Sequence, residues 1–87
     1  MTLNEILREL AYLRVTHPDI HYMTDADIGM PDGLVFVWKS GRFGYRTIAF
    51  HPSELASVED ILFRMMFCPV QLASEARIQW EKEHETD

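Results

Sequence analysis

The chain contains a single cysteine, Cys68, in 87 residues, so no disulfide can form within it. It has no apolar run approaching the ~20 residues that a membrane-spanning helix needs. Its first residues lack the positive charge and the apolar stretch of a secretory signal peptide. These absences predict one domain, residues 1–87, in a reducing compartment, and we expect a cytoplasmic protein.

Positive charge is also scarce. There are 8 lysines and arginines against 14 aspartates and glutamates, and the net charge is -6. Proteins that bind nucleic acid without sequence preference neutralise many phosphates with cations, so this balance argues against generic DNA or RNA binding. An acidic chain is better suited to a partner protein with a basic surface. We therefore expect a protein partner rather than nucleic acid or a membrane, and a homodimer is also open.

Residues that bind metals are present, but their spacing matches no metal motif. The four histidines and the cysteine form neither Cys-x-x-Cys nor His-Glu-x-x-His. A calcium loop beginning at Asp25 would need glycine at its sixth position and glutamate at its twelfth, where this chain has Met30 and Phe36. The sequence therefore predicts neither a metal site nor a cofactor.

The combination of a nucleophile, a base and an orienting group that covalent catalysis requires is missing as well. The serines lie in predicted turns and helix caps. Cys68 precedes Pro69 at an apolar helix end, which favours a structural thiol over a reactive one. We expect a protein without enzymatic activity.

What the chain does contain is a strong hairpin signal in residues 34–50, where β-branched and aromatic runs flank Ser40-Gly41. This pattern predicts two antiparallel strands joined by a tight turn. A turn at Ser40-Gly41 would place Trp38 opposite Phe43. Residues that lie opposite one another share a face of the sheet, so this register also divides the hairpin into two faces.

One predicted face is aromatic, and the other mixes valine with cations. The first carries Leu34, Phe36, Trp38, Phe43, Tyr45 and Thr47, and the second carries Val35, Val37, Lys39, Arg42, Gly44, Arg46 and Ile48. We expect the aromatic face to pack against the helices, because the cations of the second face favour partial exposure.

Apolar periodicity predicts the remaining elements. These are helices at residues 3–16, 58–67 and 70–85, a first strand at residues 20–23 and a loop at residues 25–33. Thr2 and Glu5 form a capping box at the start of the first helix, and Pro18 sets its end. The predicted fold is α+β: a helix, a three-stranded antiparallel sheet and two helices, with the helices mainly on one face of the sheet.

Two sets of charged residues are candidate binding surfaces. The first is Asp25, Asp27 and Asp32, in a loop bounded by glycine and proline, which we expect to lie outside the core and to display its carboxylates together. The alternative face consists of the cations Lys39, Arg42 and Arg46, interleaved with the aromatic residues Trp38, Phe43 and Tyr45. Cations combined with aromatic side chains are typical of surfaces that bind single-stranded nucleic acid.

The order of a helix, three strands and a helix resembles the double-stranded RNA-binding domain. The last helix of that family opens with lysines, whereas the corresponding helix here opens with Ser57-Val58-Glu59-Asp60, whose negative charge would repel phosphate. The helix at residues 58–67 has a further property, because Phe63 and Phe67 lie outside its main apolar stripe. It is apolar over most of its circumference, which indicates deep burial or a second contact.

The order of elements, the size and the acidity together resemble the small phage-encoded inhibitors of the anti-CRISPR type. Several of those are compact helix-and-three-strand domains that block a nucleic-acid-binding complex by occupying its basic surface. The resemblance covers the whole chain as a plan, without a shared motif and without transferable functional residues. It implies a non-catalytic inhibitor from a phage or mobile element. The alternatives are a regulatory nucleic-acid-binding module that uses the basic hairpin, and a dimerisation or assembly subunit that uses residues 58–67.

Overall fold

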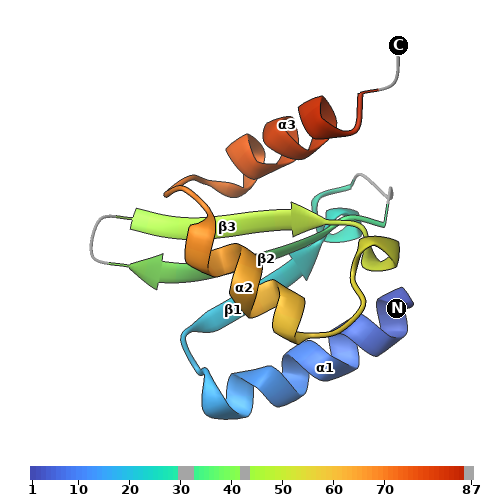
Figure 1. Ribbon diagram of the computed structural model, residues 1–87, viewed down its shortest axis with the longest axis vertical. Coiled ribbons are helices and arrows are strands. Elements are labelled where there is room, and N and C mark those ends of the chain that lie inside the picture. The colour runs from blue at the N-terminus through green and yellow to red at the C-terminus, as the bar shows by residue number, and fades with distance from the viewer. Residues whose placement is uncertain (30–32, 42–43, 86–87) are drawn as a thin grey trace.

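The computed structural model of the protein describes residues 1–29, 33–41 and 44–85 (Figure 1). In chain order the elements are α1 (Leu3–Thr16), β1 (Ile20–Thr24), the 3-10 helix η1 (Asp25–Ile28), β2 (Val35–Gly41), β3 (Gly44–Phe50), the 3-10 helix η2 (Pro52–Glu54), α2 (Glu59–Phe67) and α3 (Ala73–Glu83). The strands form one antiparallel sheet in the order β1-β2-β3. The predicted α+β fold, a helix followed by three antiparallel strands and two helices, is confirmed. None of the described helices is long and apolar enough to cross a bilayer.

Helix α1 begins where the sequence predicts, because Thr2 caps it. The Thr2 hydroxyl accepts a hydrogen bond from the Glu5 backbone N–H at 3.2 Å and donates one to the Glu5 carboxylate at 3.1 Å. The helix ends at Thr16, before Pro18. Its buried residues, Ile6 and Leu10, lie on the side that faces the sheet.

The register of the hairpin differs from the predicted one. Trp38 lies opposite Thr47 rather than Phe43, a shift of four positions, because β2 continues through the predicted turn residues to Gly41 and β3 begins only at Gly44. Side chains alternate between the two faces of a strand, so a shift by an even number of residues leaves each side chain on its predicted face. For the described residues, the division into two faces is therefore correct although the register and the turn were wrong, and Arg42 and Phe43 lie outside the described residues.

The face that packs against α1 and α2 is the one that carries the valines. Val35, Val37, Ile48 and Phe50 form one apolar cluster with residues of both helices, namely Ile6, Leu10, Ile61 and Met65. The prediction that the aromatic face lies opposite these helices is therefore wrong. Lys39 and Arg46, the described cations that argued for exposure, lie on the same face but at the hairpin end, where the strands extend beyond the helices (Figure 1).

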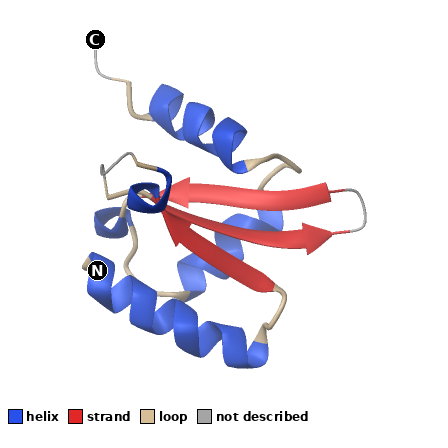
Figure 2. Ribbon diagram, turned by 180° about the vertical axis from the view of Figure 1, so that it is seen from behind, coloured by secondary structure: helices blue, strands red, loops and turns tan. Residues whose placement is uncertain are grey.

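On the opposite side of the sheet from α1 and α2, α3 lies along β3, which it contacts (Figure 2). Phe36 is 1% exposed, Leu34 is fully buried, and Ala76 of α3 is buried as well. Among the described α-helices, α1 and α2 thus pack on one face of the sheet, and α3 lies on the other side along β3. Both faces of this small sheet contribute buried apolar surface to the fold.

Helix α3 begins three residues later than predicted, at Ala73 instead of residue 70. The preceding residues pair with the outer edge of β3 instead of starting the helix. The Gln71 backbone N–H donates to the Tyr45 carbonyl at 2.8 Å, and the Thr47 hydroxyl donates to the Gln71 carbonyl at 2.9 Å. Gly44 makes this approach possible, since a Cβ there would lie 2.8 Å from the Val70 side chain. The segment protects part of an otherwise open strand edge.

Because Phe36 and Phe50 are both buried, truncation of a phenylalanine on either face of the sheet should be costly. We expect Phe36→Ala, under α3, and Phe50→Ala, against α1 and α2, each to lower the free energy of unfolding by about 3–5 kcal/mol. Tyr45→Ala is the control, because Tyr45 is 47% exposed, and it should cost less than about 1 kcal/mol. Urea unfolding followed by circular dichroism measures all three. A Phe36→Ala protein as stable as Tyr45→Ala would contradict the burial of this face by α3.

Candidate functional site

Asp25 lies inside the protein rather than on an exposed loop. Its side chain is 1% exposed, and it accepts a hydrogen bond from the Gly33 backbone N–H at 3.1 Å. Its second carboxylate oxygen lies 3.7 Å from the guanidinium of Arg77 on α3. The expectation that Asp25 is displayed to a partner is therefore wrong, because this carboxylate joins the β1–β2 connection to α3. Arg77 also pairs with Glu81, one turn further along its own helix, at 3.2 Å.

The other two predicted aspartates do not complete a displayed cluster. Asp27 is exposed, but its carboxylate accepts hydrogen bonds from the backbone N–H and the hydroxyl of Thr24, at 2.8 and 3.2 Å. These bonds cap η1. Asp32 lies outside the described residues. A binding role for this loop stays a prediction, and of the described aspartates it concerns Asp27 alone.

The cations of the alternative face are separated from its aromatic residues. Lys39 and Arg46 are cross-strand partners on the side of α1 and α2, whereas Trp38 and Tyr45 lie on the side of α3. Arg42 lies outside the described residues. A nucleic-acid strand that stacks on the aromatic side chains would meet neither of the described cations on the same face. This separation weakens the case for a nucleic-acid-binding hairpin.

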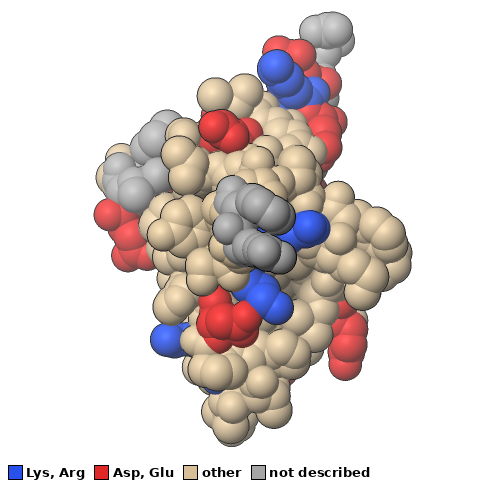
Figure 3. Space-filling view, turned by 90° about the vertical axis from the view of Figure 1, so that its left-hand side faces the viewer, with Lys and Arg blue, Asp and Glu red and all other residues tan. Residues whose placement is uncertain are grey.

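Both described cations already have partners at the hairpin end of the molecule, which Figure 3 shows. The Lys39 ammonium lies 3.3 Å from the Asp19 carboxylate. The Arg46 guanidinium donates to the backbone carbonyls of Met66 and Cys68, at 3.3 and 3.1 Å. These carbonyls end α2, where helical acceptors lack partners within the helix, so Arg46 caps this helix.

Cys68 is half-buried, and burial raises the pKa of its thiol. Its Sγ donates to the Met65 carbonyl at 3.3 Å. A raised pKa keeps the group in the thiol form, which is the less nucleophilic form. Among the described residues, no three histidine, cysteine, aspartate or glutamate side chains gather as a metal site would need.

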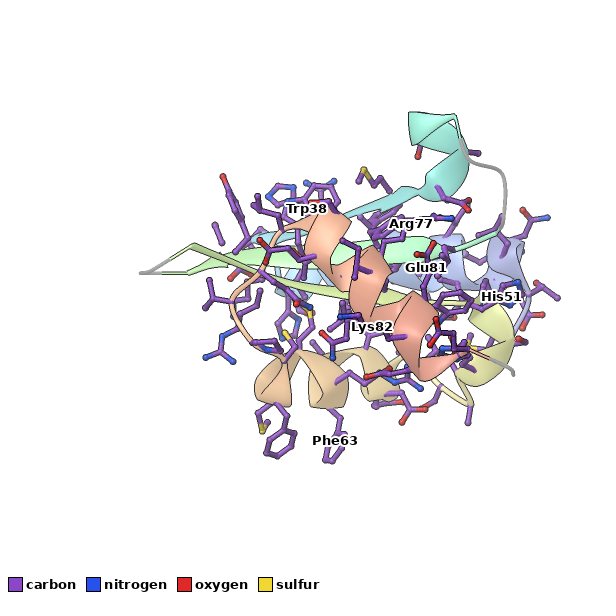
Figure 4. The ribbon with its side chains drawn as sticks, turned by 90° about the horizontal axis from the view of Figure 1, so that it is seen from above. Trp38, His51, Phe63, Arg77, Glu81 and Lys82 are labelled. Atoms are coloured by element: carbon purple, nitrogen blue, oxygen red, sulfur yellow. The ribbon has the colours of Figure 1, made fainter. Side chains whose placement is uncertain are left out.

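Helix α2 presents apolar side chains to solvent as well as to the core. Phe63, Met66 and Phe67 are 64%, 67% and 70% exposed. The rings of Phe63 and Phe67 contact edge to face, with centroids 5.1 Å apart. Figure 4 shows Phe63 pointing away from the sheet and from α3. The sequence signal for this surface is the position of both phenylalanines outside the main stripe, and the structure leaves both exposed rather than deeply buried.

A groove of about 500 Å³ lies between α2 and α3 along β3, and we call it the α3 groove. Phe63 and Phe67 line it from α2, and Trp80 and Glu83 line it from α3. Glu54, from η2, adds a second carboxylate. The α3 groove thus combines acidic groups with Trp80 of α3, and it is bordered by the part of α2 that carries Phe63 and Phe67.

The Glu54 carboxylate connects η2 with the end of α3. It accepts hydrogen bonds from the Trp80 indole N–H, at 2.9 Å, and from the His51 backbone N–H, and it pairs with the His84 imidazole. Burial acts to raise the pKa of Glu54, but these hydrogen bonds and the His84 charge outweigh it, so the pKa is lowered. The Trp80 carbonyl, together with Glu54 and Glu83, raises the pKa of His84. The contact is strongest when Glu54 is ionised and His84 is protonated.

Comparisons with known proteins found no matching family model and no matching curated protein or solved structure. The surfaces of this chain are therefore the evidence for its function. The surfaces that stand out are the exposed side of α2 and the grooves that border this helix.

The burial of Asp25 predicts that its removal is more destabilising than the removal of the exposed Asp27. We expect Asp25→Ala to lower the free energy of unfolding by about 3–5 kcal/mol, since it removes one partner of a buried ion pair. Asp27→Ala, which removes only an exposed cap, should cost about 1 kcal/mol. Chemical unfolding of the two variants measures the difference. Equal stabilities would show that the Asp25 carboxylate does not hold α3.

The pair of Glu54 and His84 makes stability depend on pH. Because the pKa of His84 is raised, its contribution is present below the ordinary value of 6.5 and is lost as the pH rises through the raised value. Because the pKa of Glu54 is lowered, its contribution is present above the ordinary value of 4.5 and is lost as the pH falls through the lowered value. The melting temperature of wild type should therefore be higher than that of His84→Gln, and this difference should be largest at about pH 5.5 and smallest at about pH 9.

Val15→Ser, at an exposed position of α1 that carries no ionisable group, is the control for this measurement. The difference in melting temperature between this control and wild type should be nearly the same at the two pH values. A His84→Gln protein whose difference from wild type is the same at both would contradict the pairing with Glu54.

Proposed function

We propose that this protein is a non-catalytic interaction module that binds a basic segment of another protein across α2 and the α3 groove. The observation that supports this proposal is the exposed edge-to-face pair of Phe63 and Phe67, which lines the groove. Aromatic and methionine side chains are enriched at the centres of protein interfaces, and a few such anchors supply most of the binding free energy. Exposed apolar clusters of this kind mark interaction sites.

The charge of the groove defines the chemistry of the partner. Glu54 and Glu83 line it together with one guanidinium, that of Arg64, and the whole chain has a net charge of -6. A complementary segment would carry arginine or lysine next to apolar side chains. Its cations would approach the carboxylates and the aromatic rings of the groove, and its apolar side chains would cover Phe63 and Phe67.

The proposal keeps the class of partner that the sequence predicts and moves the contact from the aspartate loop to α2. A basic, nucleic-acid-binding host complex would offer such a segment, so an inhibitor of the anti-CRISPR type, acting in the cytoplasm, belongs to the proposal. The second candidate is an assembly subunit in which a second copy covers α2, since the same exposed phenylalanines favour it. The two candidates differ in the oligomeric state of the free protein.

Replacing both phenylalanines should abolish partner binding without unfolding the protein. A displayed library of random peptides, selected against wild type, should yield peptides rich in arginine or lysine and in apolar residues. Their affinity for Phe63→Ser/Phe67→Ser should fall at least about thirtyfold, because an interface anchor contributes about 2 kcal/mol or more. Fluorescence anisotropy measures the affinities, and binding to wild type should weaken as salt is raised.

The matched control is Tyr12→Ser/Val15→Ser, which removes two side chains of α1 that are 70% and 78% exposed. This variant should bind the peptides like wild type. Selected peptides that are acidic, or that bind both double variants equally well, would contradict the proposal. A wild type that sediments as a dimer, together with a monomeric Phe63→Ser/Phe67→Ser, would identify a second copy as the occupant.

A further inference from the structure

The other flank of α2 borders a second groove, of about 480 Å³, at the hairpin end of the sheet, and we call it the hairpin groove. Its apolar lining comes from Ile20 of β1 and from Leu62, Met65 and Met66 of α2. Met65 and Met66 are unbranched and polarisable, so they can adapt to ligands of different shape. The phenylalanines of the α3 groove do not line it, so the two grooves use different sides of one helix.

The rim of the hairpin groove is cationic. Lys39 and Arg46 are cross-strand partners, and both line it. The ion pair of Lys39 with Asp19 is 47% and 45% exposed, so water screens it and an incoming anion can compete for the ammonium. Arg46 uses one guanidinium nitrogen for the carbonyls at the end of α2, and its other N–H groups remain able to donate. The described residues that line this groove include no aspartate and no glutamate.

We propose that the hairpin groove binds an amphipathic carboxylate, a small molecule with an apolar chain and one carboxylate head. The carboxylate lies between Lys39 and Arg46, where a guanidinium offers paired donors that match its two oxygens. The chain lies against Leu62, Met65 and Met66. The size fits, since pockets for small ligands enclose about 300–1,000 Å³. This site lies on the opposite flank of α2 from the α3 groove, and Phe63 and Phe67 are not among its lining residues.

The lining also distinguishes this ligand from a nucleic acid. A nucleic-acid strand requires aromatic side chains for stacking and a track of cations along its backbone. The described lining of the groove offers no aromatic side chain other than the imidazole of His17, and it offers two cations. The net charge of -6 repels a polyanion as a whole, whereas a single carboxylate interacts mainly with the two cations beside it.

Titration of octanoate, kept below its micelle concentration, into protein labelled at the methionine methyl groups tests the proposal. We expect saturable shifts in the NMR signals of Met65 and Met66, and none at Met23, which lies on the other face of the sheet. 1-Octanol, with the same chain and no charge, should bind more weakly, and propionate should not bind. Lys39→Gln should weaken octanoate binding about fivefold, as loss of an exposed charge pair does. Lys82→Gln, on α3, is the matched control and should bind like wild type.

A second variant places the site on α2. Met66→Asp adds a carboxylate at a residue that is 67% exposed, so the fold should persist while octanoate binding is lost. Phe63→Ser/Phe67→Ser should bind octanoate like wild type, which separates this test from that of the protein contact. Octanol that binds as tightly as octanoate, equal binding by Lys39→Gln and Lys82→Gln, or retained binding by Met66→Asp would each overturn the proposal.

Discussion

The placement of α3 depends on the buried carboxylate of Asp25. This helix contributes little apolar surface to the core, since Ala76 is its one buried residue among those described. Hydrophobic burial alone would hold such a helix weakly, because the stabilisation scales with the apolar area removed from water. The ion pair of Asp25 and Arg77 supplies a directional contact instead, and it is 1% and 12% exposed, so solvent screens it little. Removal of α3 from the sheet would expose Phe36 and would also leave a charge without its partner.

The position of α2 determines how charge is distributed over the surface. This helix packs on the valine face of the sheet and leaves one groove on each of its flanks. On one flank, η2 and α3 bring Glu54 and Glu83 beside exposed aromatic rings. On the other, the strands extend past the helices and bring Lys39 and Arg46 beside methionines. An acidic chain thus acquires one acidic and one basic groove, because each groove receives its charge from elements that are distant in the sequence.

Sequence reasoning succeeds here where structure is local and periodic. The cap at Thr2, the order of elements and the division of the hairpin into two faces all follow from spacing over a few residues. Alternation shows which residues share a face, but it does not show which helix packs against that face. The cations at the hairpin end therefore led to the incorrect prediction that the valine face is partly exposed. The burial of Asp25 depends on Arg77, a residue far along the chain, and no local pattern links the two. The exposed surface of α2 did have a local signal, in the positions of Phe63 and Phe67.

Two polar contacts hold α3, one at Asp25 and one at Glu54, and they differ in their exposure to solvent. The anchor at Asp25 is buried, whereas the anchor at the other end, between Glu54 and His84, is partly exposed, at 22% and 38%. Water and pH therefore act mainly on the second anchor, which lies beside Trp80 and the carboxylates of the groove. We expect loss of the second anchor to weaken the attachment of the C-terminal end of α3 and to leave the contact between Asp25 and Arg77 in place. In the proposed protein contact, a partner cation that approached Glu54 would compete with His84 for the same carboxylate, and its binding would be coupled to the contact that holds this end of α3.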